Sequence, residues 1–146
     1  NLSYNLIIKN ERKSKMNSNK IILVTGAEGS GKTKLSERAA QSLKMQLGRI
    51  TTDNPDKPNI KTFYSKETPE DFGKQSYAVT YTDSSGFHCG ITEEDLENSE
   101  IFVVSFNALE AFRQQYRGER EIVTIGIVSP ADVRRARLSK RIYVRG

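Results

Sequence analysis

The sequence predicts an α/β domain in which helices flank a parallel β-sheet, with a small β-rich insertion between about residues 52 and 91. Apolar, β-branched runs at 21–25, 101–105 and 122–128 are typical of buried strands, and segments with helical spacing follow them. The 146 residues are enough for one domain with a hydrophobic core and too few for two ordinary ones. Strands that alternate with helices form parallel sheets, and ligands bind at the carboxyl ends of such strands.

A phosphate-binding motif follows the first strand. Residues 26–33 read GAEGSGKT and fit G-x-x-x-x-G-K-[ST] at every fixed position. The glycines let successive backbone N–H groups point at phosphate oxygens, and the next helix adds the positive end of its dipole. A glycine-rich packing turn is the structural alternative, but it would not need lysine followed by threonine. The residues expected to bind the nucleotide are Gly26, Glu28, Gly29, Ser30, Gly31, Lys32 and Thr33.

The motif predicts Mg²⁺ as a cofactor beside the nucleotide phosphates. Lys32 would reach the β- and γ-phosphates, and the Thr33 hydroxyl would be the protein's ligand to the metal.

The remaining elements follow in chain order. The first helix is predicted over 33–47 and ends at Gly48, with a possible strand at 49–52 before the turn-rich stretch 53–59. The insertion is predicted to contain a strand at 61–64, a helical turn over 65–72 capped by Ser65 or Thr68, strands at 77–81 and 87–91, and a short helix over 92–98. A strand at 101–105, a helix over 108–116, a strand at 122–128 and a helix from Pro130 to about Arg141 complete the domain.

Composition excludes several classes of protein. Apolar residues make up 36% of the chain, and no apolar run approaches the ~20 residues that span a bilayer, so we expect no membrane partner. We recognise no signal peptide, and the single cysteine cannot form an internal disulfide. These features together favour a cytoplasmic protein.

The net charge of +5 is concentrated in residues 1–20, which hold five basic residues and one acidic residue. We therefore expect residues 1–20 to be a disordered or vector-derived leader, and residues 21–146 to form the domain. The remainder of the chain is nearly neutral, so we do not expect it to bind nucleic acid.

On these motifs the chain resembles the guanylate-kinase-like P-loop kinases across most of residues 20–145. The family's V-x-x-G-P-S-G-x-G-K-[ST] segment resembles residues 22–33, and its T-T-R-x-P-R-x-G-E segment is similar to residues 51–56, with Asp53 and Asp56 in place of two arginines. The G-x-x-Y-G hairpin resembles residues 86–90, and residues 77–92 look nearer to ribose 1,5-bisphosphate phosphokinase. The family's R-L-x-x-R segment matches Arg137, Leu138 and Arg141.

The resemblance implies ATP-dependent phosphoryl transfer to a nucleoside monophosphate resembling GMP or to a phosphorylated sugar. Lys32, Arg134, Arg137 and Arg141 would stabilise charge on the transferred phosphoryl group. Candidates for binding the small-molecule acceptor are Thr52, Tyr64, Tyr81 and His88.

Several alternatives stay open. Asp53, Asp56 and Thr80 stand where the family binds its acceptor, so a second hypothesis is a catalytically impaired module that binds ATP or a partner without efficient turnover. A P-loop motor or switch is a third, but Ser105 and Asn107 replace the acidic residue expected after the strand at 101–105.

Individual residues also have simpler interpretations. Asp53 and Asp56 are interpreted as turn formers, Cys89 as a packing residue, and His88 as either a ligand-binding or an ordinary strand histidine.

Overall fold

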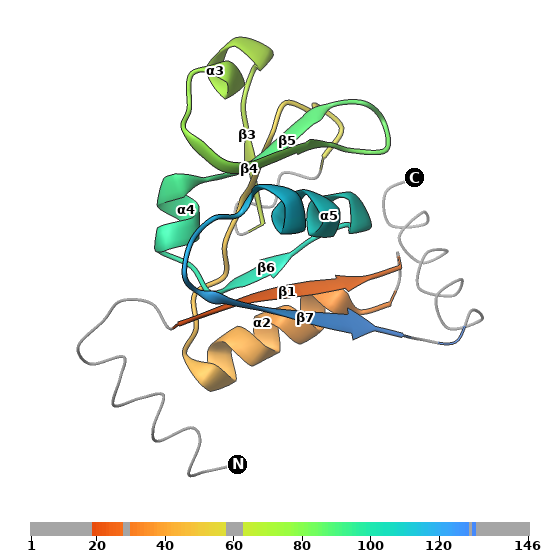
Figure 1. The fold of residues 1–146 in the computed structure, drawn as a ribbon. Helices are drawn as coiled ribbons and strands as arrows, with labels where there is room; N and C mark the ends of the chain where they lie inside the picture. Colours follow the sequence, from red (N-terminus) through yellow and green to blue (C-terminus); the bar gives the residue numbers. More distant parts are fainter. Residues whose placement is uncertain (1–18, 28–29, 58–62, 129, 131–146) are drawn as a thin grey trace.

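The computed structural model describes residues 19–27, 30–57, 63–128 and 130, which form two β-sheets with helices around them (Figure 1). In the first sheet, β1 (Lys20–Gly26) lies between β6 (Ile101–Val103) and β7 (Glu121–Ile127), and both neighbours run parallel to it. An isolated parallel bridge joins Leu47 to Ile101 of β6. The predicted α/β class and its parallel sheet are confirmed.

The insertion forms a separate, mixed four-stranded sheet. Its order is β3 (Tyr64–Lys66), β2 (Ile50–Thr52), β5 (His88–Thr92) and β4 (Tyr77–Thr82). β2 runs parallel to β3 and antiparallel to β5, and β5 also pairs antiparallel with β4. The turn between β4 and β5 closes with a hydrogen bond from the Asp83 N–H to the Phe87 carbonyl.

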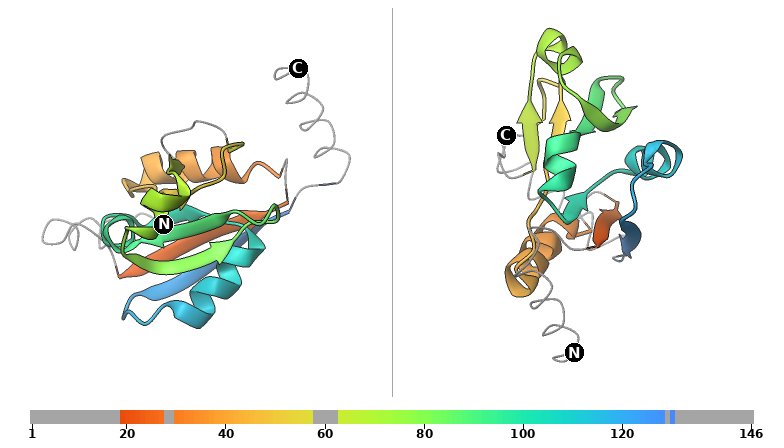
Figure 2. Two further views of the ribbon diagram at one scale, coloured as in Figure 1. Left: turned by 90° about the horizontal axis from the view of Figure 1, so that it is seen from above. Right: turned by 60° about the vertical axis from the view of Figure 1, so that its left-hand side comes forward.

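Four described helices pack around these sheets. α2 (Lys32–Leu43) contacts β1 and β6, whereas α5 (Phe106–Gln115) contacts β4. Figure 2 shows α2 and α5 on opposite sides of the parallel sheet. The short helices α3 (Pro69–Gly73) and α4 (Glu93–Glu97) begin at Thr68 and Thr92, whose side chains accept hydrogen bonds from the backbone N–H groups of Asp71 and Asp95. None of the helices in the described ranges is long and apolar enough to cross a bilayer.

Some predicted boundaries are wrong. α2 ends at Leu43 rather than at residue 47, because Lys44 adopts a left-handed conformation (φ 54°) and its N–H bonds to the Ala40 carbonyl. Gly48 does not end the helix. Glycine is needed there because a Cβ atom would lie 2.0 Å from the Phe102 ring. β3 covers Tyr64–Lys66 instead of 61–64. The helix predicted from Pro130 lies outside the described residues.

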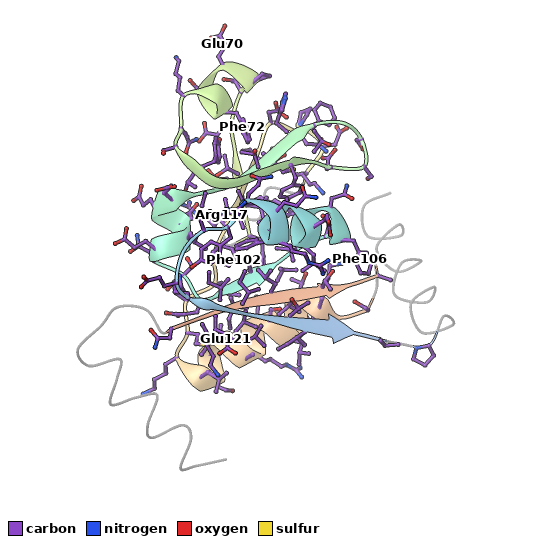
Figure 3. All side chains as sticks on the ribbon, in the orientation of Figure 1. Glu70, Phe72, Phe102, Phe106, Arg117 and Glu121 are labelled. Atoms are coloured by element: carbon purple, nitrogen blue, oxygen red, sulfur yellow. The ribbon has the colours of Figure 1, made fainter. Side chains whose placement is uncertain are left out.

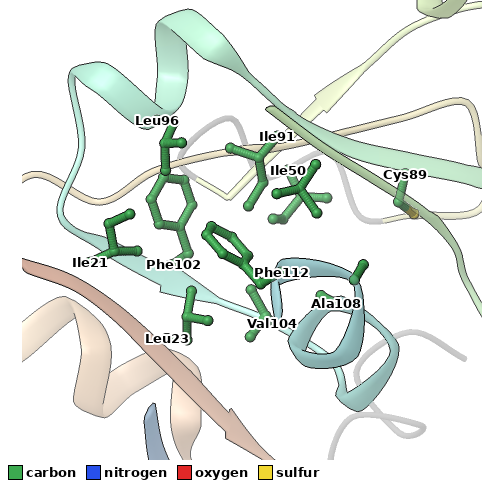
Figure 4. Packing of buried hydrophobic residues seen from close by; sticks show 12 residues of the cluster. Ile21, Leu23, Ile50, Cys89, Ile91, Leu96, Phe102, Val104, Ala108 and Phe112 are labelled. Carbon is green, nitrogen blue, oxygen red and sulfur yellow. The ribbon is translucent and has the colours of Figure 1, made fainter. Parts of the chain in front are cut away.

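One hydrophobic core joins the two sheets (Figure 4). The parallel sheet and its connections contribute Ile21, Leu23, Phe102 and Val104, and the mixed sheet contributes Ile50, Val79, Cys89 and Ile91. Leu96 of α4 and the α5 residues Ala108, Ala111 and Phe112 complete the cluster. Burial of each large side chain stabilises the fold by roughly 1.5–3 kcal/mol. The mixed sheet is therefore fixed to the parallel sheet by packing.

Candidate nucleotide and acceptor sites

The loop between β1 and α2 is closely packed where it leaves the strand. A Cβ atom on Gly26 would lie 2.6 Å from Ser30 Oγ and 2.8 Å from the Ile127 carbonyl oxygen, so a larger residue would displace the loop. The Ser30 N–H donates to the Ala27 carbonyl at 3.0 Å, and Ser30 is buried. Gly31 has φ 91°, a conformation that favours glycine. At Gly26 a larger residue would therefore clash with its neighbours, and at Gly31 it would strain the backbone.

The amino terminus of α2 suits an anion. Within the described part of the chain no side chain caps this helix, and its first turn has no acidic residue but contains Lys32 and Lys34. By contrast, α3 and α4 each have a threonine cap and acidic residues in the first turn. Backbone N–H groups and the positive dipole end at a helix amino terminus attract phosphate.

The loop lies at the point where the strand order changes direction. β1 is central, and the chain places β6 on one side of it and β7 on the other. In open α/β sheets, ligands bind at the carboxyl ends of the strands beside such a position. Thr25, the residue before Gly26, has a buried hydroxyl with no hydrogen-bond partner in the described parts of the chain.

The structure brings together Gly26, Ser30, Gly31, Lys32 and Thr33 between β1 and the first turn of α2. The other predicted residues of the donor side, Glu28, Gly29, Arg134, Arg137 and Arg141, lie outside the described residues. The described ranges contain no cluster of three or more His, Cys, Asp or Glu side chains that could hold a metal. Asn107 Nδ2 donates to the Thr82 carbonyl at 3.1 Å, so this amide connects α5 to β4.

Three of the four acceptor candidates are integrated into the fold. Thr52 is fully buried, and its hydroxyl donates to the His88 carbonyl and accepts the Asn54 N–H. The Tyr64 ring packs against the core, with Lys57 Nζ 5.4 Å from its centre. Tyr81 also packs against the core, and desolvation raises the pKa of its hydroxyl well above the usual value.

His88 is different, because 63% of its side chain is exposed. Its Nδ1 lies 2.7 Å from Oδ2 of Asp53, whose side chain is only 3% exposed. The other carboxylate oxygen of Asp53 accepts the backbone N–H of His88 at 2.8 Å, and the Asp53 N–H donates to the His88 carbonyl. A buried carboxylate therefore fixes both the backbone and the ring of an exposed histidine.

The interpretation of Asp53 as a turn former is wrong. Asn54 forms the turn, because its side-chain oxygen accepts the Asp56 N–H at 2.9 Å. Asp53 instead points inward, to a partner 35 residues away in the sequence. Asp56 is exposed, and its backbone N–H takes part in the turn.

Asp83 holds this loop against the β4–β5 hairpin. Its Oδ2 accepts Nδ2 of Asn54 at 2.8 Å, and its Oδ1 accepts the N–H groups of Ser85 and Phe87. Desolvation raises the pKa of Asp83, but the hydrogen bonds from Asn54, Phe87 and Ser85, with the charge of Lys57, outweigh it and lower the pKa below its usual value. The sequence signals only a turn here, so the connection to Asn54 could not be predicted.

Two stacked aromatic rings, Phe72 and Tyr77, lie beside the exposed histidine. The Phe72 ring stacks on Tyr77 at 4.5 Å between centroids and lies 5.6 Å from the His88 ring. Figure 3 shows Phe72 below α3, on the side of the strands. The Tyr77 hydroxyl donates to the Phe72 carbonyl at 2.8 Å. Desolvation, with the charges of Glu67 and Asp53, raises the pKa of Tyr77 to about 12.

A separate cavity of about 600 Å³ lies beside α4 and the carboxyl end of α5. Its lining includes Glu93, Gln115, Tyr116 and Arg117 but none of the residues predicted for either site.

Comparison of the sequence with protein-family models and with curated proteins finds no match. The resemblance to guanylate-kinase-like proteins stays a prediction from short motifs.

Proposed function

We propose that this protein binds ATP at the β1–α2 loop and transfers the γ-phosphoryl group to a small molecule held by the mixed sheet. The observation that carries the proposal is the GAEGSGKT loop at the carboxyl end of the central parallel strand, followed by a helix without a side-chain cap. The order β6-β1-β7, with Leu47 bridged to β6, is compatible with a P-loop kinase sheet.

The residues of the loop fit a nucleotide triphosphate with its metal. Backbone N–H groups at the start of α2 would bind phosphate oxygens, and Lys32 would add a charge-assisted contact. Mg²⁺ prefers oxygen ligands and keeps several waters, so the Thr33 hydroxyl and the phosphates would be sufficient to hold it. When bound, the metal neutralises charge on the phosphates.

Phosphoryl transfer also requires an acceptor aligned with the donor. The β4–β5 turn and the carboxyl end of β1 point in the same direction in both Figure 1 and the left view of Figure 2. An acceptor held at this end of the mixed sheet would therefore approach the donor from the side of the hairpin. By resemblance, the acceptor is a nucleoside monophosphate or a phosphorylated sugar, and Arg134, Arg137 and Arg141 supply further positive charge.

The test of this proposal compares ATP binding by Lys32→Ala with that of a matched variant, Lys34→Ala. Lys34 is exposed in the same helical turn but is not a fixed position of the motif. We expect Lys32→Ala to weaken ATP binding about tenfold or more in calorimetry, because a charged hydrogen bond contributes roughly 1.5–3 kcal/mol. Lys34→Ala should bind like the wild type. Equal affinity in both variants would contradict the assignment of the site.

A second candidate is a module that binds ATP without efficient turnover. Asp53 favours it, because an inward carboxylate replaces an arginine that the related kinases use for the acceptor phosphate. Incubation with Mg²⁺-ATP and a panel of acceptors separates the two functions. Phosphorylated product together with ADP supports the kinase, whereas binding without product from any acceptor supports the module.

A further inference from the structure

We propose that His88, positioned by Asp53, is the base on the acceptor side, and that the acceptor receives the phosphoryl group on a hydroxyl of an uncharged nucleoside or sugar. This inference rests on the proposed phosphoryl transfer. It replaces the phosphorylated acceptor that the resemblance implies with a different chemical class.

The geometry of the Asp53–His88 pair selects one tautomer of the neutral imidazole. An ionised carboxylate only accepts hydrogen bonds, so the contact of 2.7 Å between Asp53 Oδ2 and His88 Nδ1 requires the proton on Nδ1. The neutral ring then carries its lone pair on Nε2. No residue in the described ranges forms a hydrogen bond with Nε2, and most of the side chain is exposed. A base needs this combination of a fixed ring and an accessible nitrogen.

The segment that contains the mixed sheet offers little positive charge to a phosphate acceptor. Residues 50–92 hold four lysines against six carboxylates, a net charge of −2. No arginine occurs between residues 50 and 112, so this stretch offers no guanidinium to hold a phosphate with two hydrogen bonds. Of its cations, Lys66 donates to the carbonyls of Pro55 and Lys57. An uncharged acceptor would not need a cationic partner in this segment.

A hydroxyl acceptor also explains why a base would be present. A phosphate oxygen is already ionised and can attack directly, whereas a hydroxyl must lose its proton. In the proposed step, the hydroxyl oxygen forms a bond to the γ-phosphorus, and the bond from that phosphorus to the β–γ bridging oxygen breaks. ADP leaves with the electron pair of the broken bond. The hydroxyl proton moves to Nε2 of His88 and then to solvent.

The first test is spectroscopic and independent of turnover. His88 is the only histidine, so ¹⁵N NMR of labelled protein gives one set of imidazole signals. At a pH where the ring is neutral, we expect a protonated Nδ1 and a bare Nε2 in the wild type, and loss of this preference in Asp53→Asn. A proton on Nε2 in the wild type would overturn the proposal.

The second test measures transfer from Mg²⁺-ATP to nucleosides and free pentoses, and separately to nucleoside monophosphates and pentose phosphates. His88→Asn keeps an amide donor for Asp53 but has no basic nitrogen, and Glu70→Gln, at an exposed position of α3, is the control. We expect transfer only to the unphosphorylated compounds, with His88→Asn slower by roughly 10²–10⁴-fold at unchanged ATP affinity. Glu70→Gln should match the wild type.

The outcomes separate this inference from the kinase proposal. Transfer to the phosphorylated compounds instead, or a His88→Asn rate within about threefold of the wild type, overturns the role of His88 and leaves the kinase intact. Binding of ATP without transfer to either class overturns the kinase proposal, and the inference fails with it.

Discussion

Arg120 shows at the residue scale how a charged side chain can stabilise this fold. Its guanidinium donates to the carbonyls of Leu96, Ser99 and Lys20 at 2.7–2.9 Å, which ties α4, the approach to β6 and the start of β1 together. Desolvation lowers the pKa of Arg120, against the opposing influence of Tyr116 and Glu100. A guanidinium nevertheless stays charged in proteins, so these contacts remain charge-assisted.

We therefore predict that Arg120→Met lowers the free energy of unfolding by roughly 2–4 kcal/mol, because three carbonyls lose their charged donor. Arg117→Met is the matched control. Arg117 is exposed and, among the described residues, donates to the Tyr116 carbonyl alone, so its replacement should change stability by less than about 0.5 kcal/mol. Urea denaturation followed by circular dichroism measures both values. Similar losses in the two variants would contradict the role given to Arg120.

Residues whose function depends on local geometry could be predicted, whereas those with distant partners could not. Gly31 and the caps Thr68 and Thr92 act within their own turns, and Cys89 is buried as expected for a packing residue. Asp53 was misinterpreted because the sequence DNPD signals a turn and carries no sign of a histidine 35 positions later. Its local pattern and its long-range contact point to different roles.

At the scale of elements, α5 satisfies the outer edge of the mixed sheet. β4 is the last strand in that sheet, and Gln115 of α5 accepts the Thr80 N–H at 2.8 Å and donates to the Thr80 carbonyl at 2.6 Å. Asn107, two helical turns earlier, donates to the Thr82 carbonyl. Side-chain amides thus replace a neighbouring strand, which protects an edge that could otherwise pair with another chain. The helical spacing predicted α5 but not this contact.

Replacing Gln115 with leucine should expose this edge. We predict a loss of roughly 1–3 kcal/mol in the free energy of unfolding, because the Thr80 N–H and carbonyl lose their partners. Gln114→Leu is the matched control, since Gln114 is exposed and its one hydrogen bond within the described ranges goes to Glu110 of the same helix. Native-state hydrogen exchange measures the effect at one position. The Thr80 amide should lose protection in Gln115→Leu alone, and equal protection in both variants would contradict the contact.

At the scale of the whole molecule, the two sheets are parts of one cooperative structure. Phe102 of β6 and Ile91 of β5 lie in the same buried cluster, so the two sheets share their larger core, while a smaller cluster of Val24, Ala40 and Ile101 lies between the parallel sheet and α2. The alternation of strands and helices predicted the parallel sheet, but the pairing of β2 with β5 depends on a long-range register that periodicity does not determine. Because the core is shared, a local change in the mixed sheet should affect the stability of the whole domain.

The pH dependence of global stability tests this coupling through Tyr77. Its pKa rises from 10.0 to about 12 in the folded protein. Below pH 10 both states keep the proton, and between about pH 10 and 12 the unfolded state loses it first, so the free energy of unfolding falls as pH rises.

We predict that Tyr77→Phe is less stable than the wild type at pH 8.5, because it lacks the hydrogen bond to the Phe72 carbonyl. Its stability should then fall less steeply up to pH 11. Urea midpoints for both proteins at pH 8.5, 10 and 11 measure the two slopes, to which the other titrating groups contribute equally. Parallel slopes would show that the Tyr77 hydroxyl does not contribute to the alkaline loss of stability.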